Sequence, residues 1–421
     1  MKPTDTSEKG LESIIVASLV EEAGYVQGDP QDYDREHAVD RAKLLQFLSA
    51  TQPDTYEALG IDEEGPKRTQ FLHRLQGEIA KRGVVDVLRG GIKHGPAHVD
   101  LFYGTPTPGN VKAAERFAAN IFSVTRQLRY SRNETALSLD MAVFINGLPI
   151  ATFELKNKLT KQTVLDAVQQ YQRDRDPKEL LFQFGRCVVH FAVDDHEVRF
   201  CTHLKGKGSW FLPFDKGYND GAGNPPNPAG LATDYLWKET LSKEGLTDIL
   251  ENYAQVVEEK DEKTGKKRYK QIFPRYHQLK VVRMLLANAA GSGIGRRYLI
   301  QHSAGSGKSN SIAWLAHQLV GLEHESKALF DSVIVVPTGE CLTNRSATPS
   351  SSSPRFPPPS AMPSIPATCA ASSRPGRKSS SPRCRSSRSF SMRSATNTAR
   401  ANSPSSSTRP ILVRVARPLP P

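Results

Sequence analysis

The stretch that most constrains the fold runs from Leu139 to Asn157, reading Leu-Asp-Met-Ala-Val-Phe-Ile-Asn-Gly-Leu-Pro-Ile-Ala-Thr-Phe-Glu-Leu-Lys-Asn. Two apolar runs rich in β-forming residues flank Asn146-Gly147, and an Asn-Gly pair in this setting is a strong signal for a β-hairpin. The sequence therefore predicts two paired strands. Asp140 lies near the start of the first, and Glu154 and Lys156 lie at the end of the second.

The charged side chains of this hairpin suggest a metal site. Side chains two apart on a strand project from the same face, so Glu154 and Lys156 are expected to point together. Asp140 would add a second carboxylate, and two carboxylates suit Mg²⁺, which keeps several of its waters. A lysine beside the cation could stabilise an attacking hydroxide or a pentavalent phosphate. The set suits metal-assisted phosphodiester hydrolysis.

The same residues have a plainer interpretation. An acidic residue followed by Glu-x-Lys on an exposed strand is more often a solvated face. A strict two-residue turn also places Asp140 opposite Phe153, facing away from Glu154. The metal site therefore requires a β-bulge or a three-residue loop that brings Asp140 onto the Glu154 face.

The charge and the cysteines restrict what composition can say. The formal net charge of +12 comes from Thr338–Pro421, which holds 12 Arg, one Lys and a single acidic residue, Glu340. The basic and acidic residues of positions 1–337 balance, so composition gives no argument for DNA binding there.

Cys187 and Cys201 lie in apolar runs without metal-ligand spacing, which predicts buried thiols. With no leader and no membrane-spanning run, a cytoplasmic protein is expected.

The first 205 residues alternate helical and strand-like patterns. Helices are expected over Leu11–Ala23, Arg41–Ser49, Lys67–Lys81 and Thr163–Arg173, and apolar strand-like segments over Val84–Arg89, Ala97–Phe102, Asn120–Ser131, Cys187–Val193 and Val198–Thr202. This order predicts a compact α/β domain. Glu12 could approach the metal site, although an acidic residue in the first turn of a helix is commonly explained by the helix dipole. Residues 206–269 are expected to connect two domains, with a helix over Leu241–Val257 and a charged linker over Glu258–Lys270.

A second motif lies in the segment Arg297–Leu319, where a short strand, a glycine-rich turn and an amphipathic helix follow one another. This is the order of a P-loop, in which backbone amides cradle a phosphate at a helix N-terminus. The P-loop interpretation assigns ATP and Mg²⁺ binding to Gly305, Ser306, Gly307, Lys308 and Ser309. An ordinary glycine-rich turn is the alternative.

The surroundings of this motif point to one class of P-loop protein. His302 stands where the full pattern has glycine, a replacement frequent in superfamily 2 helicase-type motors. Upstream, Phe273–Gln278 looks like their adenine-reading Q motif, with Gln278 as the reader. Downstream, Asp331–Val336 is expected to be the next strand of a parallel βαβ unit.

The segment Thr338–Pro421 breaks this pattern. It holds 21 Ser, 14 Pro and 12 Arg, so it cannot bury enough apolar surface to offset its ordering entropy, and disorder is expected. One interpretation is a basic tail that binds nucleic acid. Because the change falls one strand after the P-loop, we favour the hypothesis that this segment is translated in a shifted frame.

The Asp140, Glu154 and Lys156 arrangement resembles the PD-(D/E)xK nuclease core. Together with the P-loop, the chain resembles the N-terminal part of the R subunit of type I restriction-modification enzymes, and the resemblance covers nearly all of residues 10–336. It implies an α/β fold with a restriction-endonuclease-like domain over 1–205, followed by the start of a helicase-type RecA-like domain over 270–337.

The resemblance also implies an activity: ATP-driven translocation and double-strand cleavage of DNA with Mg²⁺, in complex with methyltransferase and specificity subunits. Asp140 and Glu154 would bind the metal, Lys156 would be the catalytic lysine, and Gln170 is a candidate supporting residue. Because the motor pattern stops at position 337, ATP hydrolysis by this chain is doubtful. An ATP-binding or DNA-binding scaffold, an inactive fragment and a stand-alone helicase-related ATPase stay open as alternatives.

Overall fold

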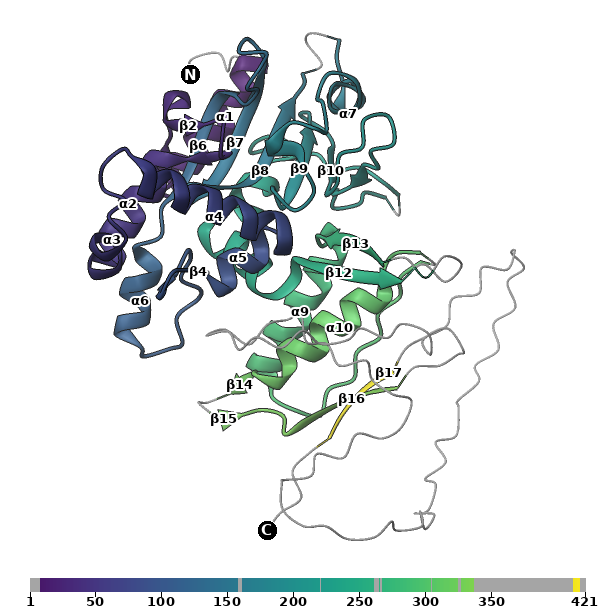
Figure 1. Ribbon diagram of the computed structural model, residues 1–421. Helices are drawn as coiled ribbons and strands as arrows, with labels where there is room; N and C mark the ends of the chain where they lie inside the picture. Colours follow the sequence, from purple (N-terminus) through teal and green to yellow (C-terminus); the bar gives the residue numbers. More distant parts are fainter. Residues whose placement is uncertain are drawn as a thin grey trace.

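A mixed sheet organises the N-terminal part of the chain in the computed structural model (Figure 1). The structure describes residues 8–157, 161–219, 221–260, 265, 267–303, 305–324, 327–336 and 412–416. Within these ranges seven strands pair in the order β1-β6-β7-β8-β9-β10-β11. They are β1 Val26–Gln27, β6 Phe122–Arg129, β7 Ser138–Ile145, β8 Leu148–Leu155, β9 Val189–Val193, β10 Val198–Cys201 and β11 Leu212–Pro213. β1 is parallel to β6 and β8 to β9, whereas the other neighbours are antiparallel.

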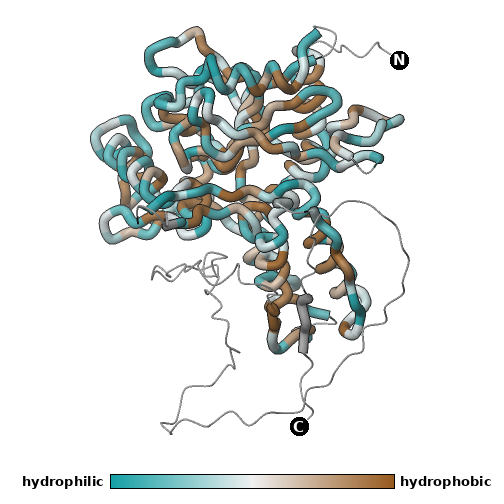
Figure 2. Tube along the Cα trace, turned by 90° about the vertical axis from the view of Figure 1, so that its right-hand side faces the viewer, coloured by the Kyte–Doolittle hydropathy of each residue, from teal (hydrophilic) through white to brown (hydrophobic). Residues whose placement is uncertain are grey.

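Helices cover the sheet, and apolar segments gather in its interior (Figure 2). The larger core packs α1 Glu8–Ala17, α4 Pro66–Arg82 and α5 Val84–Gly90 against side chains of β7, β8 and β9. Smaller clusters include Tyr171 and Ala167 of α7 Val164–Arg173, together with Ala142 and Phe144 of β7. Because β8 is buried throughout, Glu154 lies inside the domain, whereas Asp140 near the start of β7 is half-buried.

The remaining elements of this part are short. They are α2 Arg41–Thr51, α3 Pro53–Leu59, α6 Val111–Ala118 and α8 Lys243–Asp248, the strand pairs β2 Tyr33–Asp34 with β3 Val39–Asp40 and β4 Ile92–His94 with β5 Ala97–Val99, the 3-10 turns Pro30–Asp32 and Leu180–Phe182, and the π-helical turns Ser18–Glu22, Leu236–Thr240 and Ile249–Tyr253. The four predicted helices are confirmed, the first with its last turn in π geometry.

The strand-like prediction for Val84–Arg89 is wrong, because this segment is α5. The valines there are buried among neighbouring elements, and burial has overridden their preference for strands.

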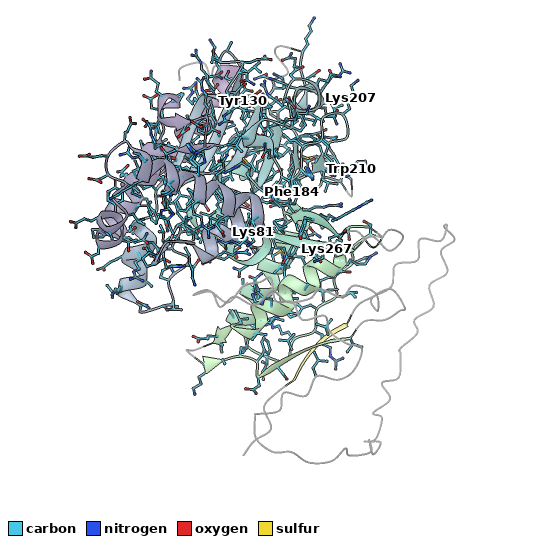
Figure 3. All side chains as sticks on the ribbon, viewed as in Figure 1. Lys81, Tyr130, Phe184, Lys207, Trp210 and Lys267 are labelled. Atoms are coloured by element: carbon cyan, nitrogen blue, oxygen red, sulfur yellow. The ribbon has the colours of Figure 1, made fainter. Side chains whose placement is uncertain are left out.

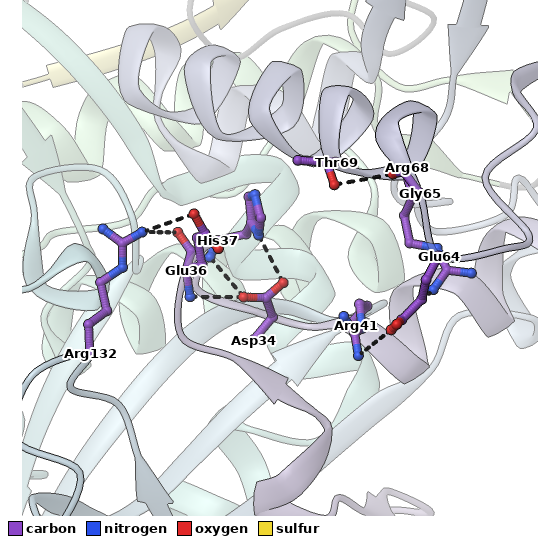
Figure 4. A network of polar contacts seen from close by, with 9 residues as sticks. All are labelled: Asp34, Glu36, His37, Arg41, Glu64, Gly65, Arg68, Thr69 and Arg132. Atoms are coloured by element: carbon purple, nitrogen blue, oxygen red, sulfur yellow. Dashed lines mark hydrogen bonds and ion pairs between the residues drawn. The ribbon is translucent and has the colours of Figure 1, made fainter.

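Polar contacts fix the loop between β2 and β3 (Figure 4). Asp34 Oδ1 accepts from Glu36 N at 2.8 Å, and Asp34 Oδ2 contacts His37 Nδ1 at 2.8 Å. Arg132 reaches the same loop through Glu36, and Arg41 at the start of α2 pairs with Glu64 at 3.1 Å. These contacts tie the segment after β6 to the N-terminal elements.

The charged segment Glu258–Lys270, which is expected to be a linker, takes part in a β-hairpin. β12 Gln255–Lys260 and β13 Lys267–Ile272 pair as an antiparallel hairpin. The buried Gln271 amide donates to Cys187 O and Val188 O at 2.7 and 2.6 Å, so the hairpin is anchored to the strand that enters β9. The helix expected over Leu241–Val257 is present over Lys243–Tyr253, as α8 and the π-helical turn that follows it, but it ends before Val257 because the chain is extended from Gln255.

The C-terminal described part contains α9 Tyr276–Ser292, α10 Lys308–Val320, the pair β14 Glu323–His324 with β15 Lys327–Ala328, and the pair β16 Ser332–Val336 with β17 Leu412–Ala416. The expected parallel βαβ unit is wrong within these residues: β16 pairs antiparallel with β17, and positions 297–301 form no strand. A strand needs neighbours to bond, and Leu299, with 86% of its surface exposed, has none of the expected packing. The rest of the predicted disordered segment lies outside the described residues.

Two further expectations concern the whole described chain. Cys187 and Cys201 are free and buried, as predicted, whereas the other three cysteines lie outside the described residues. No helix of the described residues has the length and apolar character to cross a membrane.

Candidate functional site

The hairpin that carries the candidate site closes with the predicted turn. Asn146 and Gly147 have φ of 50° and 80°, the left-handed values that a two-residue hairpin turn requires. The buried Asn146 amide donates to Leu101 O and Asn120 Oδ1, both at 2.9 Å. Its Oδ1 accepts from Ile121 N at 2.7 Å. Neighbouring segments therefore hold the turn in place.

The β-bulge that the site requires is present. Ile150 is an extra residue in β8, where the ladder between β7 and β8 shifts its register. Because of this shift, Phe153 pairs with Met141 and not with Asp140. Asp140 therefore comes level with Glu154, as predicted for a competent site.

Backbone groups surround Asp140. Its Oδ2 accepts from Leu155 N at 2.7 Å, so its carboxylate reaches across to β8. On the other side, Gln127 of β6 lies level with Asp140 but is missing from the ladder, and its φ is 48°. A left-handed conformation is costly for a residue other than glycine, and such strain is concentrated at functional sites.

Glu154 is the most buried charged residue of the site, with its side chain 0% exposed. Its Oε1 accepts from Arg175 Nε at 2.6 Å. Its Oε2 is buried and has no hydrogen-bond partner within the described part of the chain. A carboxylate oxygen in this condition is costly unless a cation or a donor reaches it.

Arg175 is the site residue that sequence reasoning missed. Its guanidinium, 5% exposed, donates to Glu154 and to Ser138 O at 2.9 Å. It also lies 5.6 Å from the centre of the Tyr130 ring and contacts that hydroxyl at 3.4 Å. In the sequence Arg175 lies among alternating charges just after α7, a pattern typical of a solvated helix end, so no local signal identified it.

Lys156 follows the last residue of β8 and is 8% exposed. Its backbone N–H donates to Val193 O at 2.9 Å, which continues the pairing with β9. The positive charge of its ammonium acts to lower the pKa of Glu154. The structure therefore places Asp140, Glu154 and Lys156 in one neighbourhood, as the spacing predicted.

Burial dominates the electrostatics of Glu154. Loss of solvent raises its pKa to about 8, and the Asp140 carboxylate adds to that rise. Arg175 and Lys156 act in the opposite direction but do not cancel the effect of burial. A divalent cation at this site would act in the same direction as Arg175 and Lys156 and would favour the charged carboxylate.

A Mg²⁺ ion fits these residues. Glu154 Oε2 is a hard oxygen donor that no described residue bonds, and the Asp140 carboxylate lies on the adjacent strand at the same level. Two carboxylates plus waters are an ordinary Mg²⁺ donor set. No group of three or more His, Cys, Asp and Glu side chains with metal-site geometry occurs among the described residues.

Two further candidates have other contacts. Glu12 on α1 is buried and accepts from Gln127 Nε2 at 3.0 Å while its other oxygen pairs with Arg126. It supports the strained residue beside Asp140. Gln170 lies half-buried on α7, next to Tyr171, whose hydroxyl bonds Thr152 Oγ1 at 2.8 Å. The role of Gln170 stays a prediction.

The second motif forms the predicted turn and helix. Gly305 and Gly307 have φ of 74° and 83°, and α10 begins at Lys308, with Ser309 in its exposed first turn. Lys308 Nζ donates to the carbonyls of residues 302 and 303 at 3.1 and 3.0 Å.

Gln278 braces this turn. Its Nε2 donates to Ser306 O at 3.1 Å and Gly307 O at 2.9 Å, and its Oε1 accepts from Arg275 N at 2.9 Å. The amide is therefore engaged by the protein, and adenine reading by Gln278 stays a prediction.

Comparison with known proteins bears on the first 209 residues. Residues 5–209 match the family described as type I restriction enzyme R protein N terminus. Two proteins of Methanocaldococcus jannaschii, candidate endonuclease subunits of the type I restriction enzymes MjaVIIIP and MjaIXP, are each 25% identical to the chain, over 208 and 227 residues. The matched parts cover 47% and 49% of this chain but 18% and 20% of those proteins. The chain thus spans about a fifth of the length of the curated relatives it matches.

Proposed function

We propose that the part of the chain that matches the N-terminal region of type I restriction enzyme R proteins, residues 5–209, is a Mg²⁺-dependent endodeoxyribonuclease. The observation that carries the proposal is the β-bulge at Ile150, which brings Asp140 level with Glu154. Glu154 Oε2, which has no hydrogen-bond partner among the described residues, adds to it, since a buried carboxylate oxygen without a donor suits a cation.

Each residue has a distinct task in this proposal. Asp140 and Glu154 hold the cation from adjacent strands. The cation, when bound, lowers the pKa of a water and neutralises charge on the phosphate. Lys156 places an ammonium beside the same phosphate, where negative charge increases as the pentavalent state forms. The hydrogen bond from Leu155 N fixes the Asp140 carboxylate, so little reorganisation is needed when DNA binds.

The test is nicking of a supercoiled plasmid by the full chain in Mg²⁺. Asp140→Ala and Lys156→Ala are each expected to reduce the nicking rate by at least about a hundredfold, the scale on which loss of an electrostatic catalytic group acts. Lys81→Ala is the matched control, because Lys81 is exposed on α4 and takes no part in the proposed site (Figure 3).

The outcomes separate the nuclease from its main alternative. Nicking that persists in Asp140→Ala and Lys156→Ala at the unaltered rate would mean that the hairpin is structural. The chain would then serve as a scaffold that binds DNA or ATP. A reduced rate in Lys81→Ala equal to that of Lys156→Ala would point to nonspecific loss of fold.

The activity of the whole R protein is a second, separate proposal. ATP-driven translocation, double-strand cleavage and assembly with methyltransferase and specificity subunits would require a motor beyond the described residues. The left-handed Gly305 and Gly307 and the helix that begins at Lys308 favour a phosphate site in this chain. Equilibrium dialysis with labelled ATP tests it: Lys308→Ala is expected to weaken ATP binding at least about tenfold, and unchanged binding would refute the assignment.

A further inference from the structure

We propose that Arg175 is a positioning residue for the cation site: it holds one oxygen of Glu154 and thereby keeps the other oxygen turned toward the cation. The inference rests on the proposed function, because it concerns the same carboxylate. It adds to the proposed site a residue from outside the β7–β8 hairpin, since Arg175 lies 19 positions after Lys156.

The first argument is the way Arg175 meets the carboxylate. Only Nε bonds Glu154, through Oε1 at 2.6 Å, and Oε2 is left without a partner in the described chain. An arginine that served only to neutralise a buried carboxylate would commonly bind both oxygens with its fork. The single bond fixes the orientation of the carboxylate and leaves one oxygen for another ligand.

The second argument is that Arg175 is itself held in place. Its Nη2 donates to Ser138 O, two residues before Asp140, at 2.9 Å. Its guanidinium also lies by the Tyr130 ring and contacts its hydroxyl. Figure 3 labels Tyr130 at the end of the sheet far from Lys267 of the β12–β13 hairpin. With anchors on β7 and on the segment after β6, the guanidinium stays in position when a cation binds at the free oxygen.

The third argument concerns the position of Arg175 in the chain. It follows the residue that caps α7, and the capping box at the N-terminus of that helix fixes its start. A rigid helix therefore delivers the guanidinium to the sheet. Groups that orient a metal ligand in this way are commonly worth a factor of about 10 to 100 in metal affinity.

The experiment measures binding of Mn²⁺ to the full chain by electron paramagnetic resonance, which reports the free ion and needs no catalysis. Arg175→Gln removes the charge and the brace, and is expected to weaken binding about 10- to 100-fold. Arg175→Lys keeps a charge that can reach Glu154 but cannot also bond Ser138 O, so it should recover part of the loss.

Arg89→Gln is the matched control. Arg89 is also buried and donates to two carbonyls, those of Leu250 and Ala254, at 2.6 and 2.7 Å. It lies on α5 and none of these contacts involves the hairpin. Its replacement is expected to lower the melting temperature without changing the affinity for Mn²⁺.

Glu154→Gln completes the design, because it separates failure of this inference from failure of the proposed function. If Glu154→Gln leaves Mn²⁺ binding intact, the cation site and the proposed function are both wrong. If Glu154→Gln abolishes binding while Arg175→Gln binds Mn²⁺ as tightly as the unaltered chain, or more tightly, only the positioning role of Arg175 is overturned. Equal weakening in Arg89→Gln and Arg175→Gln would likewise overturn it.

Discussion

Replacement of Gly147 by alanine tests whether the turn is fixed by the rest of the fold or only by its own backbone. Gly147 has φ of 80°, and a Cβ there would lie 2.3 Å from Asp40 O, 2.7 Å from Leu44 N and 2.8 Å from Leu44 Cβ. An ordinary contact begins at 3.4 Å, so the start of α2 would have to retreat by about 1 Å. Asp40 N also donates to Gly147 O at 2.8 Å, and this bond opposes the retreat.

The expected loss in the free energy of unfolding of Gly147→Ala has two separate contributions. A left-handed conformation costs a non-glycine residue about 1–2 kcal/mol. Forcing atoms into a packed region costs about 1–3 kcal/mol more. Gly147→Ala should therefore lower the free energy of unfolding by roughly 2–5 kcal/mol, a large part of the stability of a typical domain.

Gly109 supplies the matched control. Its φ of 81° is close to the 80° of Gly147, but a Cβ at this position meets no atom within 4 Å. Gly109→Ala should therefore cost only the backbone term of about 1–2 kcal/mol. The assay is urea denaturation of both variants and the unaltered chain, with unfolding monitored by circular dichroism. Equal losses in the two variants would refute the reasoning, because they would show that the contact with α2 contributes nothing.

Three other predictions concern the folded domain. Burial raises the pKa of Asp215 to about 6 from 3.8, so between these pH values the folded state holds a proton that the unfolded state has lost. The free energy of unfolding should therefore fall as pH rises from about 4 to about 6. Urea titrations at several pH values should show this fall, and it should be smaller in Asp215→Asn. Burial also raises the pKa of the Cys187 and Cys201 thiols, that of Cys187 to about 12. Alkylation of the folded chain at pH 8, followed by peptide mapping, should therefore find both thiols unmodified. Rapid labelling of either thiol would contradict its burial. Thr163→Ala removes the capping hydroxyl of α7 and should cost about 1 kcal/mol by urea denaturation; no loss would mean that packing alone fixes the helix start.

The position of Arg175 shows why the site could be predicted only in part. Asp140, Glu154 and Lys156 belong to one local hairpin, so spacing along the chain was enough to group them. Arg175 joins them through a contact between residues 21 positions apart, across the end of α7. A contact of this kind depends on how the helix packs on the sheet, and that information is distributed over many side chains.

Some of the C-terminal predictions are wrong for a related reason, because they concern the pairing of strands and not local turns or helix ends. The turn at Gly305 and Gly307 and the start of α10 are local features, and they appear as predicted. The strand at positions 297–301 and the parallel pairing of β16 depend on neighbours in a sheet, and neither appears in the described residues. The charged composition of the β12–β13 hairpin gave no indication that it is packed. Its packing depends on contacts with the strand that enters β9, which only the tertiary structure provides.

The sequence by itself determined the turn at Asn146-Gly147 and the helix over Thr163–Arg173, because each depends on residues that are adjacent or nearly so. The predicted metal site also required a β-bulge or a three-residue loop in the hairpin, but the sequence could not say which of the two would form or where an extra residue would lie. The tertiary structure decided that Ile150 is that residue and that Glu154 is buried against Arg175. The reason is that register and burial are set by the packing of the whole sheet against its helices, which no local pattern contains.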